Sequence, residues 1–252
     1  MNTTGVPNKA YEVAMTKQFS VKTIQKEFRA LGDEKIAEHS KGFFKTGKGQ
    51  YGEGDKFLGI RMPVIRKQAK GYGDCSLEQV SKILESPYHE ERMLAVVMLV
   101  DRFKNADEEG QKTIYDIYLG NAQYVNGWDL VDISAPPIAG GYLENRDRSV
   151  LYELAKSTDL WKRRIAIVAT FFFIRRNDFK DVVAISTILR DDSEDLIHKA
   201  VGWMLREMGK RDMDVERKFL KKNYRKMPRT MLRYAIEKFP EDERQGYLRG
   251  VI

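Results

Sequence analysis

The segment at residues 126–132, NGWDLVD, holds two side chains of chemically useful types four residues apart. Trp128 and Asp132 would share one face of a helix, which places an indole ring one turn from a carboxylate. An indole face attracts cations, and a preorganised carboxylate stabilises positive charge that develops nearby. The structural alternative is a half-buried tryptophan followed by an acidic first helical turn, a role that Asp129 suits better than Asp132.

Two later residues could complete such a site. Arg164 lies in LWKRRIAI (160–167), and Trp203 lies in HKAVGWMLRE (198–207). Taken singly, Arg164 is better explained as a solvated surface charge and Trp203 as core packing. Together they are of more interest, because each lies close to an alanine that recurs along the chain in a weak sequence repeat.

Other catalytic chemistries find little support. The three histidines are isolated and no CxxC or HExxH motif occurs, so neither a metal nor a cofactor is expected. Cys75 is the only cysteine, which excludes a disulfide framework, favours the cytoplasm, and leaves a thiol nucleophile without an evident base. GxGxxG at 47–52 has no preceding strand and does not indicate dinucleotide binding. The Gly- and Lys-rich segment 42–59 is either a phosphate-approaching loop or a plain surface loop.

The elements around these residues are predicted to be helices. Apolar residues recur at three-and-four spacing almost everywhere, as in 90–103, and alternating patterns are scarce. Ser76 and Gln79 form a capping-box signature, and Pro63 and Pro228 are expected at first helical positions. The fold class is therefore all-α, with about a dozen helices.

A weak repeat organises the helices. RMLAVVML, RRIAIVAT, HKAVGWML and LRYAIEKF share a basic residue followed by an alanine between large apolar residues. Their alanines, Ala95, Ala166, Ala200 and Ala235, are 71, 34 and 35 residues apart, and a degenerate unit around 131–135 fits the longer gap. This period predicts a HEAT-like helical repeat solenoid, with an ordinary helical bundle as the alternative. A solenoid presents one helix per repeat on its concave face, so distant residues can converge there.

Composition fits one globular domain spanning 1–252, with residues 1–19 as a loosely attached N-terminal segment. Apolar residues make up 42% and charged residues 32%, and the net charge is +7. No apolar run is long enough to span a membrane, and no secretory signal is visible. The positive charge favours a polyanionic partner but does not distinguish DNA from RNA or a membrane surface.

Four motifs carry a resemblance to a known family: FLGIRMP (57–63), GWDLVD (127–132), LWKRRIAI (160–167) and HKAVGWMLRE (198–207). From about residue 20 to about residue 240 the chain resembles the AlkD-type DNA alkylation-repair glycosylases, which are built from HEAT-like repeats. The resemblance implies that Trp128 and Trp203 wall the lesion site, that Asp132 is the catalytic carboxylate, and that Arg164 holds the DNA backbone near the lesion.

Further basic side chains are expected to contact DNA: Lys48 in the Gly-rich segment, and Lys199 and Arg206 in the last motif. The chain departs from the family pattern at Gly127, where some members carry another tryptophan, and its Gly-rich segment is longer than in some members. The N-terminal third is accordingly the hardest part to align.

The resemblance implies a monomeric, metal-free and cofactor-free DNA glycosylase that excises positively charged N3- or N7-alkylpurines from duplex DNA. Whether the lesion flips out of the helix or stays stacked is left open. Two alternatives also stay open. One is a non-catalytic HEAT-repeat protein that binds damaged or branched DNA. The other is a HEAT-type protein–protein scaffold, which would not need these four residues to converge.

Overall fold

The computed structural model describes residues 20–252, so the expected loosely attached segment 1–19 lies outside the described residues. The described part is helical throughout, without a strand; Lys56 and Tyr88 form one isolated β-bridge. Within 20–252 no helix has both the length and the apolar character needed to cross a membrane. The all-α prediction is confirmed.

The helices are α1 (Val21–Arg29), α2 (Glu34–Phe43), α3 (Met62–Gly71), α4 (Leu77–Leu84), α5 (His89–Asn105), α6 (Glu108–Gly120), η1 (Ala122–Tyr124), α7 (Trp128–Ser134), η2 (Ala135–Gly140), α8 (Ser149–Leu154), α9 (Leu160–Ala169), α10 (Phe171–Ile174), α11 (Lys180–Ile188), α12 (Asp195–Gly209), α13 (Met213–Asn223), η3 (Tyr224–Lys226), α14 (Arg229–Ala235), η4 (Ile236–Lys238) and α15 (Glu241–Arg249).

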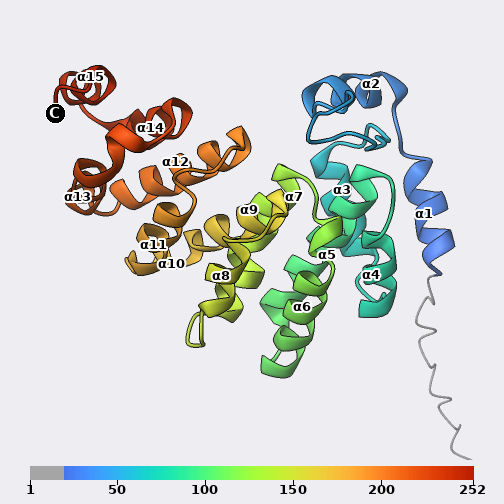
Figure 1. Ribbon diagram of the computed structural model, residues 1–252. Coiled ribbons are helices and arrows are strands. Elements are labelled where there is room, and N and C mark those ends of the chain that lie inside the picture. Colours follow the sequence, from blue (N-terminus) through green and yellow to red (C-terminus); the bar gives the residue numbers. More distant parts are fainter. Residues whose placement is uncertain (1–19) are drawn as a thin grey trace, which may run out of the picture.

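One series of helices forms the spine of the molecule. Helix α5 packs on α7, α7 on α9, α9 on α12, and α12 on α14. These are the helices that carry the repeat alanines, and α7 is the degenerate unit between the first two. Figure 1 shows the helices following an arc from α1 at one end to α15 at the other. The predicted helical repeat solenoid is confirmed.

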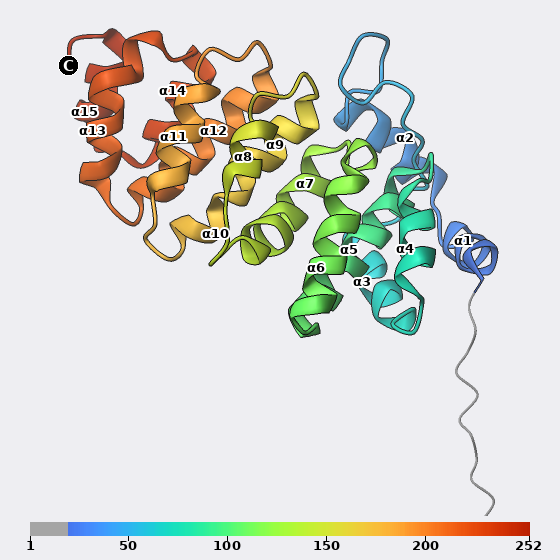
Figure 2. The ribbon, with the colours of Figure 1, turned by 60° about the horizontal axis from the view of Figure 1, so that its bottom comes forward.

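A second series of helices covers the outer side of this spine. Helices α3 and α4 pack on α5, α8 packs on α9, and α11 and α13 pack on α12. Figure 2 shows α4 beside α5, α8 beside α9 and α11 beside α12 along the arc. The core lies between the two series, and all four repeat alanines are buried in it. Small side chains at these positions let neighbouring helices approach closely.

The helix starts predicted from local sequence signals agree with the observed starts to within one residue. Ser76 caps α4, and both hydrogen bonds of the capping box with Gln79 are present. Pro63 is the second residue of α3 rather than the first, and Pro228 is the cap before α14 rather than its first residue. Both prolines therefore lie in the first turn or just outside it, where a missing N–H costs no helical hydrogen bond.

A wide turn follows α7. Helix α7 continues directly into η2, which has π-helical hydrogen bonding and contains Pro136 and Pro137. Neither proline can donate a backbone hydrogen bond, so the regular α pattern cannot continue through them. Such π segments are often found at functional sites. This one begins three residues after Asp132.

The close approach of α12 and α14 at Gly202 predicts a stability effect. A Cβ at Gly202 would lie 2.5 Å from the Met231 carbonyl oxygen and 2.5 Å from the Tyr234 Cβ. We expect Gly202→Ala to lower the free energy of unfolding by about 1–3 kcal/mol, because α12 and α14 must separate. Gly42→Ala is the control, since a Cβ there meets nothing within 4 Å. Urea unfolding that ranks Gly42→Ala as the more damaging change would contradict this packing.

Candidate active site

Asp132 and Arg164 form an ion pair between the spine helices α7 and α9. The guanidinium donates from Nε to Oδ1 at 2.9 Å and from Nη2 to Oδ2 at 2.8 Å. Its Nη1 donates to the backbone carbonyl of Leu196 on α12 at 2.7 Å. The Arg164 side chain is 6% exposed and that of Asp132 is 18% exposed. Arg164 is therefore not the solvated surface charge that its sequence position alone suggested.

Burial of Asp132 disfavours the ionised form of its carboxyl group. Burial raises the pKa of Asp132 above the usual range for aspartate, while the charge and hydrogen bonds of Arg164 act in the opposite direction. The carboxylate is thus poorly hydrated but fixed in orientation by a two-pronged partner. A negative charge held this way interacts more strongly with a cation than one in bulk water does.

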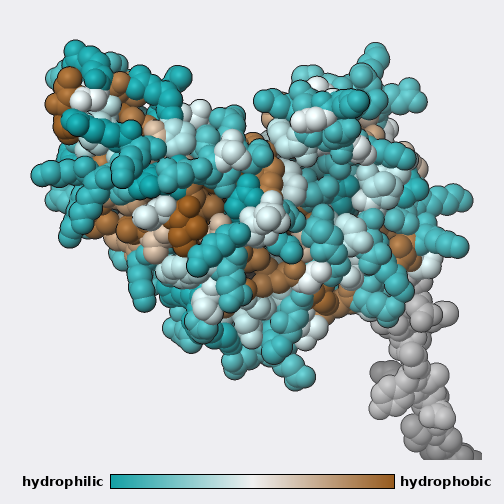
Figure 3. Space-filling view, viewed as in Figure 1, coloured by the Kyte–Doolittle hydropathy of each residue, from teal (hydrophilic) through white to brown (hydrophobic). Residues whose placement is uncertain are grey.

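A pocket of about 570 Å³ opens beside this pair. It brings together Trp128, Asp132, Arg164 and Trp203, as the sequence predicted. Figure 3 shows the surface hollowed between the two ends of the arc. The remaining lining residues come from the Gly-rich segment and from α12 and α14: Phe43, Lys45, Tyr51, Glu194, Asp195, Leu196, Lys199, Arg206 and Tyr234.

The two tryptophans are half-buried and support the pocket from different helices. Trp128 begins α7 and stacks on Phe44, with ring centroids 5.6 Å apart and planes at 21°. Trp203 on α12 packs against Phe171 and donates from its indole N–H to Glu207 Oε1 at 3.2 Å. Both also pack against the hydrophobic core. Core packing and pocket lining are therefore compatible roles for these side chains.

The basic residues predicted to contact DNA differ in position. Lys199 lines the pocket and forms an ion pair with Asp195 at 2.7 Å. Arg206 also lines it and is paired with Glu237. Lys48 lies exposed in the Gly-rich segment and does not line the pocket, whereas Lys45 of the same segment does. The DNA contacts themselves stay predictions.

Four of the pocket residues that sequence reasoning missed are aromatic or basic: Phe43, Lys45, Tyr51 and Tyr234. Tyr234 precedes the repeat alanine Ala235, so the rule that singled out Arg164 and Trp203 could have found it. The other three lie in or beside the Gly-rich segment, where no periodicity indicates which side chains point inward.

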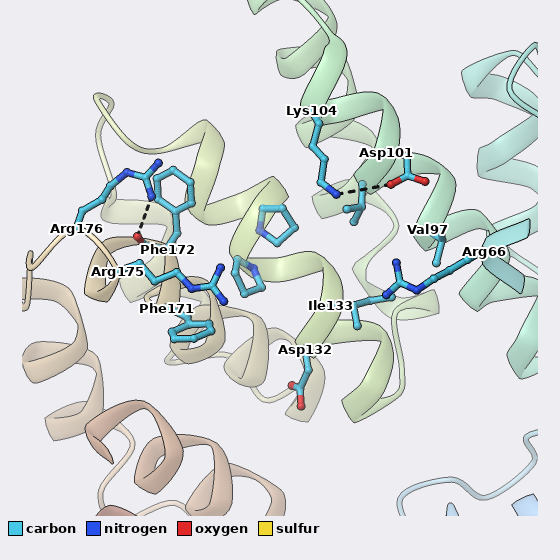
Figure 4. A pocket seen from close by; sticks show the side chains of 13 residues that line it. Arg66, Val97, Asp101, Lys104, Asp132, Ile133, Phe171, Phe172, Arg175 and Arg176 are labelled. Carbon is cyan, nitrogen blue, oxygen red and sulfur yellow. Dashed lines mark hydrogen bonds and ion pairs between the residues drawn. The ribbon is translucent and has the colours of Figure 1, made fainter. Parts of the chain in front are cut away.

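A second pocket, of about 470 Å³, adjoins the first, and Asp132 lines both. Its lining includes the apolar side chains of Ile133, Pro136 and Pro137. Figure 4 shows Arg66 and Arg175 reaching in from opposite sides, with Asp132 at the edge. Both arginines are exposed, and neither forms an ion pair within residues 20–252. Arg175 lies over the Phe171 ring at 4.1 Å from its centroid.

A buried histidine ties the Gly-rich segment to the spine. His89, at the start of α5, is 2.9 Å from Asp129 through Nε2 and 3.3 Å from Asp55 through Nδ1. Its ring also stacks on Phe57. A Cβ at Gly127 would lie 2.9 Å from the His89 Cε1 atom. A side chain at this position would therefore crowd the His89 ring.

Metal and thiol chemistry gain no support from the described residues. Across 20–252, no group of three or more histidine, cysteine or acidic side chains is arranged to hold a metal ion. Cys75 is buried, and burial raises the pKa of its thiol, which disfavours the nucleophilic thiolate.

The fold and the pocket define a helical-repeat protein whose inner surface carries an aromatic-walled carboxylate. A family model described as DNA alkylation repair enzyme matches residues 24–239. The chain belongs to this family, so it has a role in alkylation repair.

Two solved structures have a similar fold. A predicted DNA alkylation repair enzyme from Enterococcus faecalis is similar over 83% of this chain and 97% of its own, at 15% identity and a TM-score of 0.64. AlkD2 from Streptococcus mutans is similar over 87% and 96%, at 19% identity and a TM-score of 0.50. Among curated proteins, none matches the chain in sequence. The resemblance to the AlkD-type family is confirmed.

The His89 contacts predict a pH-dependent stability. Burial alone lowers the pKa of His89, but the charge of Asp129 and the hydrogen bonds to Asp129 and Asp55 outweigh it and raise the pKa to about 9. Protonated His89 therefore contributes stability that is complete below the unfolded-state pKa of 6.5 and is lost as pH rises through about 9. The rise in the pKa of His89 from 6.5 to about 9 corresponds to about 3 kcal/mol of stability.

Urea unfolding of wild type and His89→Gln at a series of pH values between about 6 and about 10 checks this expectation. The wild-type free energy of unfolding should decline toward that of the variant as pH rises. Parallel pH profiles for the two proteins would show that His89 is not held in its charged form.

Proposed function

We propose that the protein is a monofunctional DNA glycosylase that excises positively charged N3- or N7-alkylpurines from duplex DNA. The observation that carries the proposal is a poorly hydrated carboxylate, Asp132, fixed by Arg164 at the meeting of two pockets. One pocket has aromatic walls suited to a cationic base. The other is lined by basic and apolar side chains, and its basic groups suit a sugar–phosphate backbone.

The reaction follows from the charge of the lesion. An alkylated purine leaves with the electron pair of the glycosidic bond, which neutralises its positive charge, so no general acid is required. The sugar acquires oxocarbenium character at C1′ as the bond breaks. Asp132 stabilises that charge, and water adds at C1′ and releases a proton to solvent. The products are free base, an abasic site and that proton. At ~4 Å such an attraction is ~4 kcal/mol near a protein surface.

The role of Arg164 in this proposal is first to position Asp132. Three of its nitrogen atoms already donate hydrogen bonds within the protein, so its contact with a phosphate would use its remaining N–H groups. The exposed Arg66 and Arg175 are better placed to neutralise phosphates, with Lys199 and Arg206 on the side of the aromatic pocket. The enzyme would act as a monomer in the cytoplasm, without metal or cofactor.

The scaffold alternative gives no reason for a buried carboxylate beside aromatic rings. A surface built for protein–protein contact gains little from an ion pair whose desolvation is costly. Only a measurement of base release distinguishes a non-catalytic DNA-binding protein from a glycosylase.

Substitution of the carboxylate tests the chemistry. We expect Asp132→Asn to slow release of N7-methylguanine from duplex DNA by ~10²–10³, the loss of ~2.7–4 kcal/mol typical of a preorganised electrostatic group. Duplex affinity should stay near the wild-type value, because the charge acts on the transition state. Single-turnover release and fluorescence anisotropy measure the two quantities.

Asp116→Asn is the matched control, since Asp116 lies exposed on α6, where it pairs with Lys112. It should release base at the wild-type rate. A thermal melt confirms that Asp132→Asn stays folded after losing one of its two guanidinium hydrogen bonds. Release by a folded Asp132→Asn protein at the wild-type rate would refute the proposed mechanism.

Salt dependence tests the backbone contacts. The logarithm of duplex affinity should fall linearly with the logarithm of salt concentration, with a slope of about −0.9 for each phosphate neutralised. Arg175→Gln should weaken binding and make the slope shallower by about one. Arg249→Gln, at an exposed residue that lines neither pocket, should leave the slope unchanged. Equal slopes for wild type and Arg175→Gln would remove Arg175 from the interface.

A further inference from the structure

The exposed face of α13 carries a row of cations that the proposed function does not use. Their positions follow the spacing i, i+3, i+4 and i+7, so they share one side of α13 and of the η3 turn that continues it. All of them are exposed, whereas Phe219 and Leu220 on the opposite side of α13 are buried in the core. This row is termed the basic stripe, and it consists of Lys218, Lys221, Lys222 and Arg225.

The charges of the basic stripe are not neutralised within the protein. None of its side chains forms an ion pair with an acidic group of residues 20–252. Asp214 on α13 and Glu243 on α15 are paired with Arg217 instead, at 3.3 Å and 2.9 Å. Elsewhere, exposed helical lysines have an acidic partner one turn away, as Lys82 has in Glu78. The stripe therefore differs from an ordinary solvated helix surface.

Cations one turn apart within the stripe repel each other. Lys218 is three residues before Lys221 and four before Lys222. The same two spacings separate these lysines from Arg225. Like charges at such spacings destabilise a helix. A bound polyanion would relieve this repulsion, which the protein's own acidic side chains do not.

The stripe lies apart from the two pockets that meet at Asp132. Helix α13 packs on α12 in the outer series of helices, and no stripe residue lines either pocket. Figure 1 shows α13 at the C-terminal end of the arc, below α14. The stripe lines a separate hollow of about 850 Å³, to which Arg217 and Lys226 add two further cations. A duplex of about 20 base pairs is stiff, since the persistence length of DNA is about 150 base pairs, so one held along the inner surface does not bend round to the stripe.

Charge is the main means of recognition on this surface. Protein–protein interfaces are poor in lysine and rich in aromatic residues, and helices that lie on membranes expose apolar side chains beside their basic face. Helix α13 turns its apolar side toward α12, and Ile252 is the one exposed apolar side chain among the described residues that line the hollow. A DNA strand presents one phosphate per about 3.4 Å, so a row of about 10 Å spans about three phosphates.

We infer that the basic stripe is a second DNA-binding surface, which holds a separate duplex segment while the inner surface is occupied. The inference rests on the proposed function, which assigns the first duplex to the inner surface. The stripe contacts phosphates, so it binds the second segment without regard to sequence or damage. Holding two segments at once lets the protein pass from one stretch of DNA to another without first returning to solution.

Sedimentation velocity with an excess of a short fluorescent duplex counts the duplexes bound to each protein molecule. At ~50 mM salt, wild type should form a complex of one protein with two duplexes. A variant with all four stripe residues changed to glutamine should bind one duplex. The affinity for the second duplex should fall by about 100-fold between ~50 and ~200 mM salt, because four phosphates give a log–log slope near about −3.6.

A matched variant removes the same amount of charge elsewhere. Its four lysines are exposed, line neither the pockets at Asp132 nor the hollow, and are also changed to glutamine: Lys22, Lys26, Lys156 and Lys180. This variant should still bind two duplexes. Both variants should release N7-methylguanine from a duplex at the wild-type single-turnover rate, since the stripe lies outside the site. Thermal melts confirm that both are folded.

Each failure has a distinct meaning. A wild-type complex with a single duplex, or a stripe variant that still binds two, would overturn the second surface while the proposed function stands. Equal loss of the second duplex from both variants would also overturn it, because net charge alone would explain the binding. A complex of two proteins with two duplexes would assign the joining of duplexes to a protein dimer instead. If wild type binds no duplex, the proposed function fails, and the inference fails with it.

Discussion

The guanidinium of Arg164 is the contact on which the arrangement of the site depends. It bonds both oxygens of Asp132 on α7 and the Leu196 carbonyl on α12, and it belongs to α9 between them. Three successive spine helices are therefore fixed around one buried charge. A buried cation without its partner would cost several kcal/mol, so the pair strongly favours a single arrangement of these helices. The same constraint fixes the orientation of the carboxylate.

This arrangement carries a cost in stability. Because burial raises the pKa of Asp132 above its value in an unfolded chain, keeping it ionised at neutral pH lowers the free energy of unfolding. A core optimised only for stability would have no reason to keep such a group, and stability is commonly given up where function needs a poorly hydrated charge. The ion pair and the two pockets that meet at Asp132 thus both support a functional role for this carboxylate.

Local patterns predicted much of the fold and part of the site. The repeat alanines located the spine helices, and the spacing of Trp128 and Asp132 placed both in the pocket because helical periodicity is local. The buried ionisable residues at the start of α5, such as His89 and Glu90, could not be predicted, because their partners lie more than thirty residues away in the chain. Phe43 escaped prediction for a related reason: long-range charge pairs, not a repeating pattern, hold its segment in place.

The most direct measurement is the amount of free base released by the wild-type protein from a duplex that contains N7-methylguanine. Chromatography of the supernatant separates free base from DNA, and electrophoresis shows whether the strand stays intact before alkaline treatment. The account predicts N7-methylguanine in the supernatant, well above spontaneous loss, together with abasic sites in unbroken strands. Release at the spontaneous rate by a protein that binds the duplex would contradict the proposed glycosylase activity. The protein would then be a non-catalytic DNA-binding protein.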